Sequence, residues 1–329
     1  MVKIILFSSM FMSYIIGAFS NSDVFFKDFI QKYNKEYSSN EERTKRFEIF
    51  VENLEYIKEH NNRNDTTYTL GINHLADLRH DELGLGLQLN LGPSKCNKFN
   101  SEYNYKSLPE SIDWRDNNAV TPVKDQGQCG SCWSFSATGA MEGSWSIETG
   151  DLVSLSEQQL VDCSSGFGTY GNHGCNGGLM DNAFQYAIDN GMCTESEDPY
   201  TAKKETCDTD CDKKAFYSSC QDVTANNQQD LAAAVSQQPV SIAIEADTKA
   251  FQLYTSGVLT GSACGTNLDH GVLIVGYGTE DGQDYWLVKN SWSTSWGDNG
   301  YIKIGKSDST NDVGVCGIAS TPSFPVAKN

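Results

Sequence analysis

Basic residues are scarce in this chain of 329 residues. It contains 24 lysines and arginines against 43 aspartates and glutamates, so its formal net charge is −19. A phosphate backbone or an anionic membrane surface requires a basic face, so the composition argues against nucleic acid and membranes as partners. Proline is rare as well, with 7 residues, and the 29 glycines are too few for a collagen-like chain. Hydrophobic residues make up 39%, which is enough for a globular protein.

Long apolar runs are missing except at the amino end. Residues 1–20 contain one lysine, an apolar run over 4–16 and small residues at positions 17, 18 and 20. A bilayer-spanning helix needs about 20 apolar residues, so this order instead predicts a secretory signal peptide over 1–20. The chain is therefore expected in the secretory pathway, leading to a lysosome or other acidic vacuole or to secretion, where cysteines pair by default. The sequon at Asn64 is a glycosylation candidate on that route.

The rest of the chain divides into a charged arm and an acidic body. Residues 21–107 carry a net charge of −2, whereas residues 108–329 carry −18. Apolar residues at helical spacing predict two amphipathic helices in the arm, one from Ser22 to Tyr33 and one from about Glu41 to Asn61. Such a small helical hairpin needs a larger surface to pack on.

The body changes character along its length. Its first half predicts three helices. One begins near Cys132 and ends before Gly150, one follows the capping-box spacing of Ser154 and Glu157, and one runs from about Leu179 to Asn190. Its second half predicts strands over 240–246, 271–278, 283–292 and 301–306, separated by glycine-rich turns. This order favours an α+β fold of two lobes, with the site in the cleft between them.

Cys129 and Cys132 form a C-x-x-C motif that allows three interpretations. A redox pair would need a thioredoxin-like βαβ context, which does not surround it. A zinc site with Cys207 and Cys211 is disfavoured on an oxidising route. In the third interpretation Cys129 is structural and Cys132 is a nucleophile, because Cys132 begins a helix whose dipole favours a thiolate.

A nucleophilic thiolate also needs a histidine. Of the five histidines, three lie in the arm and His173 lies in a glycine-rich loop. His270 precedes an apolar strand, and Asn290 on the neighbouring predicted strand could orient its ring. By base rate a structural role for His270 and a turn role for Asn290 stay open at this point.

Four motifs resemble the papain-like cysteine proteases, nearest the cathepsin L type. They are QGQCGSCWSF, CNGGLM (175–180), LDHGVLIVGYG (268–278) and KNSWSTSWG (289–297), in the family's order. The arm resembles the inhibitory propeptide of that family through an E-x3-R-x3-F-x2-N-x3-I-x3-N helix and a G-x-N-x-F-x-D strand. The matching positions are Glu42, Arg46, Phe50, Asn53, Ile57 and Asn61, then Gly71, Asn73 and Asp77, with Leu75 in place of the usual phenylalanine.

The resemblance implies a papain-like fold with a mainly helical lobe and an antiparallel β-barrel-like lobe. It implies an inhibitory propeptide over 21–107 and a mature peptidase domain over 108–329. The implied activity is that of a cysteine endopeptidase made as a latent zymogen. In it Cys132 is the nucleophile, His270 is the base and then the acid, Asn290 orients the imidazole, and Gln126 with the Cys132 N–H forms the oxyanion hole.

By the same resemblance, Gly177 and Gly178 bind an extended substrate backbone and Trp292 shields the His270–Asn290 pair. Other implied substrate-binding residues are Leu179, Met180, Ala243, Leu268, Asp269 and Thr321. Because this wall is apolar or small and Thr321 supplies no acid, we expect bulky apolar side chains before the cleaved residue and rejection of arginine there.

The resemblance also implies the disulfides Cys129–Cys175, Cys163–Cys207 and Cys264–Cys316. Cys193, Cys211 and Cys220 in the body and Cys96 in the arm are left over. One further bridge among the first three is expected, with a pairing that the sequence does not choose, and the third of these cysteines should remain free or pair elsewhere. No metal or cofactor is expected.

The implied partners are polypeptide substrates, the chain's own propeptide and cystatin-type inhibitors, acting on a monomer. The alternatives are a catalytically inactive papain-like binding or storage protein, an extracellular disulfide-rich adhesion module and a peptide ligase.

Overall fold

The structure is a computed structural model that describes residues 22–89, 94–100, 107–165 and 170–328. The expected signal peptide over 1–20 lies outside these residues. No helix among the described residues combines the length and apolar character that crossing a bilayer requires.

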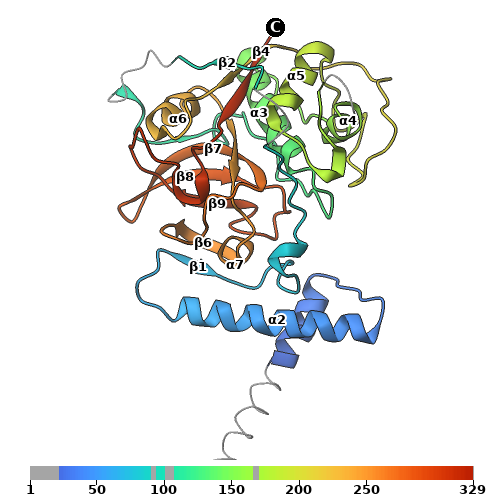
Figure 1. The fold of residues 1–329 in the computed structure, drawn as a ribbon, viewed down its shortest axis with the longest axis vertical. Helices are drawn as coiled ribbons and strands as arrows, with labels where there is room; N and C mark the ends of the chain where they lie inside the picture. The colour runs from blue at the N-terminus through green and yellow to red at the C-terminus, as the bar shows by residue number, and fades with distance from the viewer. Residues whose placement is uncertain (1–21, 90–93, 101–106, 166–169, 329) are drawn as a thin grey trace, which may run out of the picture.

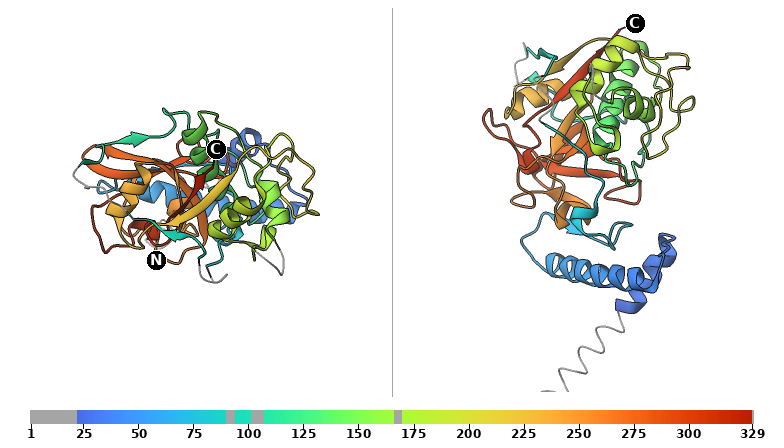
Figure 2. Two further views of the ribbon diagram at one scale, coloured as in Figure 1. Left: turned by 90° about the horizontal axis from the view of Figure 1, so that it is seen from above. Right: turned by 45° about the vertical axis from the view of Figure 1, so that its right-hand side comes forward.

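The arm forms a helical unit against one end of the body (Figures 1 and 2). Residues 22–32 are helical, and α2 spans Asn40–Asn61 after Ser39, whose side chain accepts the N–H of Glu42. Aromatic and aliphatic residues of both helices share a core with Leu253 of the body; among them are Phe26, Phe29, Phe50 and Leu54. The two helices predicted for the arm are therefore present. The arm continues through β1 (Tyr68–Leu70) and the 3-10 helix η1 (His80–Glu82).

The helical lobe is built from α3 (Cys132–Thr149), α4 (Glu157–Cys163), the 3-10 helix η3 (Gly174–Asn176) and α5 (Met180–Asn190). Gly150, in a left-handed conformation with φ 78°, ends α3 as predicted. The N-cap of α4 is Ser156 rather than the predicted Ser154. The reason is tertiary, because Leu155 forms a β-bridge with Thr194 and so stays extended up to the cap.

The strand lobe is one curved sheet with the order β1-β6-β9-β8-β7-β5-β10-β4-β2, to which β3 adds on β7. Its strands are β2 (Asn97–Lys98), β3 (Ile112–Asp113), β4 (Tyr217–Asp222), β5 (Val240–Ile244), β6 (Tyr254–Leu259), β7 (His270–Glu280), β8 (Gln283–Lys289), β9 (Tyr301–Gly305) and β10 (Ser323–Ala327). Its pairs are antiparallel except β6 with β9 and β2 with β4. The four predicted strands are β5, β7, β8 and β9.

Three shorter elements belong to the body as well. They are α6 (Gln228–Val235), α7 (Lys249–Gln252) and the 3-10 helix η4 (Val315–Gly317). The second half of the body was predicted as strands only, so α6 and α7 correct that expectation.

Buried hydroxyl groups fix α3 against the sheet. Ser136 Oγ donates to the Val272 carbonyl at 2.7 Å, and Ser241 Oγ donates to the Ser136 carbonyl at 2.8 Å. These bonds connect α3 of the helical lobe to β7 and β5 of the strand lobe. The first residues of α3 and β7 are thereby held at the junction of the two lobes.

Candidate active site

Cys132 is the first residue of α3 and is fully buried. It is the free cysteine of the described chain, since the other ten form five disulfides. The neighbouring Cys129 is bonded to Cys175, which fixes the loop in front of the helix. The C-x-x-C motif is therefore split between a structural and a free cysteine.

His270 begins β7 and Asn290 directly follows β8. The Nε2 atom of His270 lies 2.8 Å from Asn290 Oδ1, and both residues are buried. The Trp292 ring covers the imidazole, with ring centroids 4.8 Å apart and an angle of 32° between the planes. Because Nε2 is occupied by Asn290, the other ring nitrogen, Nδ1, is left as the available base; it is buried without a hydrogen-bond partner.

The beginning of β7 contacts the beginning of α3. The backbone N–H groups of Gly271, Gly86 and Trp133 face the sulfur of Cys132 and favour its thiolate form. Burial nevertheless raises the pKa of the Cys132 thiol to about 11. Burial also lowers the pKa of His270 to about 4, although the hydrogen bond with Asn290 acts in the opposite direction. Both groups are therefore neutral at pH 7 in this closed form.

Gln126 is fully buried in the loop before α3. Its Nε2 donates to the Cys129 carbonyl at 3.0 Å and to the Gly84 carbonyl of the arm at 2.6 Å. Its Oε1 accepts the Ser291 hydroxyl at 2.7 Å, which orients the amide so that Nε2 faces the site. A carbonyl oxygen of the arm thus occupies the donor that sequence analysis assigned to the oxyanion.

The arm crosses this site as an extended segment, residues 84–88. Gly178 N–H donates to the Gly86 carbonyl at 2.9 Å, and Gln88 N–H donates to the Gly178 carbonyl at 3.0 Å. The bridge between Leu87 and Gly178 is parallel. The arm therefore occupies the main-chain groups that an extended peptide would use.

The expected apolar wall is only partly assembled around Leu87. Met180 and Ala243 are buried in one cluster, against which Leu268 and Leu87 of the arm pack. Leu179 is buried as the N-cap of α5, whereas Thr321 is exposed.

Gly177 and Asp269 take part through their backbones. Gly177 has φ 110°, and a Cβ there would lie 2.6 Å from the Gly86 carbonyl oxygen. The Asp269 carbonyl accepts the Leu87 N–H at 3.1 Å, while its carboxylate accepts the N–H groups of Ala246 and Asp247.

The structure joins the three cysteine pairs that the resemblance implied, Cys129–Cys175, Cys163–Cys207 and Cys264–Cys316. It also joins Cys193 to Cys211 and Cys96 of the arm to Cys220 of the body. His173 is exposed and takes no part in the site.

Sequence reasoning missed four residues that contribute to the site. Ser291 and Tyr200 hold Gln126, the latter by donating its hydroxyl to the Gln126 carbonyl at 2.9 Å. Gly84 and Gly86 let the arm approach the body closely. The alternating Gly-Leu-Gly-Leu over 84–87 was the available signal.

A free cysteine at a helix start, a buried histidine–asparagine pair on the neighbouring strands and an arm across the site form the arrangement of a cysteine-nucleophile protein closed by its own chain. Comparison with known proteins gives the family. The sequence profile described as "Papain family cysteine protease" matches residues 108–326, and that of the "Cathepsin propeptide inhibitor domain (I29)" matches residues 26–83. The chain belongs to the papain family of cysteine proteases and carries the family's propeptide domain.

The similarity to known proteins extends over most of the chain. The chain is 47% identical over 310 residues to cysteine proteinase RD21A of Arabidopsis thaliana, covering 92% of this chain and 66% of that protein. It is 46% identical to senescence-specific cysteine protease SAG39 of Oryza sativa subsp. japonica, covering 90% and 88%. The chain spans 62–66% of the length of the three RD21 relatives.

Solved structures with the same fold include precursors. A recombinant stem bromelain precursor superposes with a TM-score of 0.85 at 36% identity, covering 94% of this chain and 100% of that one. Digestive procathepsin L 3 of Tenebrio molitor larval midgut gives 0.82 at 40% identity, covering 93% and 99%. The predicted α+β papain-like fold with a helical propeptide is therefore confirmed.

Proposed function

We propose that this chain is the zymogen of a cysteine endopeptidase. The observation that supports this most is the position of Cys132. It begins α3 against the strand that carries His270, under an arm that occupies Gln126 and Gly178. The arm, residues 21–107, acts as an intramolecular inhibitor, and the mature domain begins at or near Leu108.

The catalytic cycle uses proton transfer between Cys132 and His270. Once the arm leaves, water reaches the site, and the Cys132 proton moves to Nδ1 of His270, which gives a thiolate and an imidazolium. The sulfur attacks the scissile carbonyl carbon, and the imidazolium gives its proton to the leaving amine. Water then attacks the acyl-enzyme and releases Cys132. Asn290 Oδ1 accepts Nε2–H throughout and so keeps the proton-accepting nitrogen toward the sulfur.

The negative oxygen of each tetrahedral intermediate needs two donors. Gln126 Nε2 and the Cys132 N–H supply them, and the loss of one such donor typically costs about 3–4 kcal/mol of transition-state stabilisation. Gln126 is held in place by Ser291 before any substrate arrives. The site is thus preorganised for acyl transfer.

Substrates bind as extended chains on the main chain of Gly178, in the opposite direction to the arm. Their side chain before the cleaved residue meets the wall of Leu179, Met180, Ala243, Leu268 and Thr321. We expect Leu and Phe to be accepted there and Arg to be rejected, since the wall offers a guanidinium no carboxylate.

The cellular route follows from the sequence. A cleaved signal peptide over 1–20 would send the chain into the secretory pathway and on to an acidic vacuole or out of the cell. Asn64 is exposed between α2 and β1, where a glycan can be attached. The enzyme acts as a monomer on polypeptides and is a target for cystatin-type inhibitors.

The test compares wild-type and Cys132→Ser zymogens, both trimmed by the same added protease. They are assayed in mild acid with thiol reductant on a fluorogenic peptide with Phe or Leu before the cleaved residue. We expect cleavage by the wild type alone, and much slower cleavage of the peptide with Arg at that position. No cleavage by folded, correctly trimmed wild type would instead identify an inactive papain-like binding or storage protein.

A further inference from the structure

The Cys96–Cys220 disulfide connects two parts of the chain that maturation would separate. Cys96 lies in the arm, between the stretches that match the propeptide profile (26–83) and the peptidase profile (108–326). Cys220 lies on β4 of the body and is 2% exposed. The two Cα atoms are 4.7 Å apart. A cut at Leu108 therefore breaks the main chain but leaves this second covalent connection.

The segment around Cys96 is also docked by non-covalent contacts. β2 adds to the sheet beside β4, at the end of the molecule opposite to α2 (Figure 1). The Phe99 N–H donates to the Asp222 carbonyl at 2.8 Å, and the Phe99 ring meets Phe324 edge-on at 5.4 Å. These contacts are remote from Cys132 and do not depend on the inhibitory contacts over residues 84–88.

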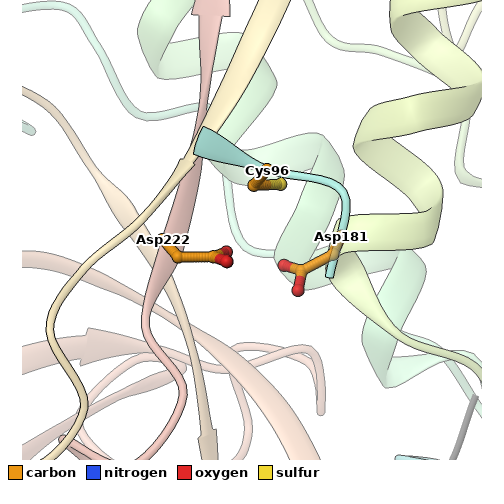
Figure 3. A group of neighbouring side chains, drawn as sticks. All are labelled: Cys96, Asp181 and Asp222. Atoms are coloured by element: carbon orange, nitrogen blue, oxygen red, sulfur yellow. The ribbon is translucent and has the colours of Figure 1, made fainter. Parts of the chain in front are cut away.

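Two carboxyl groups complete the docking site. Figure 3 shows Asp181 and Asp222 pointing toward each other beside Cys96. The Ser94 side chain lies beside both carboxyl groups and favours their charged forms, and Ser323 Oγ donates to Asp181 at 2.6 Å. The sulfur of Cys96 lies within 4.8 Å of the carboxylate oxygens, but it is bonded to Cys220 and cannot serve as a thiolate ligand. We therefore read this cluster as part of the docking surface and not as a metal site.

We infer that Cys96–Cys220 survives maturation and makes the processed enzyme a two-chain molecule, in which a piece of the propeptide stays bound to β4. The inference rests on the proposed function for its maturation step. After a cut at Leu108 alone, the inhibitory residues 22–88 remain tethered, and their return to the cleft is intramolecular. Short tethers give effective concentrations of about millimolar, so the cut species closes again at any dilution. Lasting release needs a second cut, on the amino side of Cys96.

The first experiment measures mass and does not need the chain's own activity. The full Cys132→Ser zymogen is cut in mild acid by a small amount of an added, unrelated cysteine endopeptidase, and thiols are then blocked. Intact mass and amino-terminal sequence are recorded with and without a disulfide reductant. Without reductant, we expect a body chain that begins near Leu108 and carries a peptide containing Cys96. Reduction of the Cys96–Cys220 disulfide should release this peptide and leave one free thiol on each of the two chains.

Two outcomes would overturn the inference. One is the body chain alone, without its Cys96 peptide, before reduction. The other is a mature chain that begins on the amino side of Cys96 and is never cut near Leu108. Neither outcome bears on whether Cys132 is a nucleophile, which the peptide assay decides separately.

Matched double variants test the consequence for latency. Cys96→Ser/Cys220→Ser removes the tether, and Cys193→Ser/Cys211→Ser removes a disulfide within the body and keeps the tether. Each zymogen is cut at the junction, returned to neutral pH and diluted about a hundredfold. We expect the inhibition of the wild type and the body-disulfide variant to persist, and the tetherless variant to gain activity on dilution. Equal dilution behaviour of all three would contradict the tether's role.

If the tetherless zymogen fails to fold, the mass measurement on the Cys132→Ser zymogen still decides the inference.

Discussion

Cys132 and His270 are both fully buried in the zymogen, and removal from water disfavours the charged form of each. The thiol has its pKa raised to about 11 and the imidazole has its pKa lowered to about 4. Their ionisation as a pair therefore has to wait for the arm to leave. Latency at this scale is chemical as well as steric.

The neutral thiol of Cys132 in the zymogen is predicted to react slowly with alkylating reagents. At pH 7 a thiol with a pKa of about 11 is ionised in about one molecule in 10,000, and only the thiolate reacts with iodoacetamide. We expect Cys132 in the intact zymogen to be alkylated at least about tenfold more slowly than in the trimmed enzyme. Mass spectrometry of the Cys132 peptide measures the rate, with Cys132→Ser as the blank. Equal rates would mean that the arm does not close the site.

Gly86 supplies a second prediction at the residue scale. A Cβ at Gly86 would lie 1.9 Å from the Gly130 carbonyl oxygen, so Gly86→Ala must lift the arm from the cleft. Overpacking of this kind typically costs about 1–3 kcal/mol, which corresponds to roughly 5- to 150-fold weaker inhibition. Gly84→Ala is the graded control, because its Cβ would lie 3.0 Å from the Gly127 carbonyl oxygen. Proteolytic activity of the untrimmed zymogens at neutral pH should rise more for Gly86→Ala; no rise for either would contradict this prediction.

Among elements, those with strong local signals were predictable from the sequence. α3 follows an apolar stripe that ends at Gly150, and β7 follows an unbroken apolar run. β4 and β10 lack such patterns, since one reads YSSCQD and the other contains Pro325. They form strands because they pair with each other, although about a hundred residues separate them in the sequence. The local pattern of hydrophobic residues cannot predict a pairing over that distance.

The charged link between η1 and α2 makes the arm sensitive to pH. Burial would raise the pKa of Glu82, but hydrogen bonds from the Arg79 N–H, Arg46 and Lys45 outweigh it and lower the pKa to about 2. A carboxyl group with a depressed pKa stabilises the fold fully above its ordinary pKa of 4.5, and this contribution is lost as the pH falls from there toward 2. Glu82 therefore contributes to the loosening of the arm in acid.

Glu82→Gln removes this contribution at every pH. We expect the variant zymogen to be processed at a higher pH than the wild type and to show a shallower dependence of processing rate on pH below 4.5. The control is Asp81→Asn, which breaks an exposed ion pair with Arg79 and should change little. Gel analysis of processing rate across pH 3–7 measures both. Identical profiles for Glu82→Gln and wild type would exclude Glu82 as a pH-sensitive element.

For the whole molecule, the number of cysteines gives information about disulfide pairing that local motifs do not. The body has ten cysteines, so one free nucleophile leaves an odd number, and the arm has the single Cys96. Parity thus favours a bridge between arm and body, but only the sheet shows that β2 brings Cys96 to Cys220. The candidate site was predictable because its residues lie in dense motifs. The arm's path over them was not, since it depends on glycine contacts between distant segments.

The acidity of the body predicts where the whole molecule is most stable. Burial raises the pKa of Asp181 to about 6, from an ordinary value of 3.8, despite the bonds from Ser323 and Ser94. The folded protein therefore takes up this proton before the unfolded chain does, and stability rises as the pH falls from about 6 toward 3.8. A shift of this size corresponds to on the order of 3 kcal/mol between the two ends of that window.

We expect the Cys132→Ser zymogen to have a higher Tm at pH 5 than at pH 7. Asp181→Asn, which cannot ionise, should raise the Tm at pH 7 and reduce the difference, whereas Asp189→Asn, at the exposed end of α5, should not. Calorimetry at the two pH values measures this, and an unchanged difference in Asp181→Asn would show that other carboxyl groups set the pH dependence.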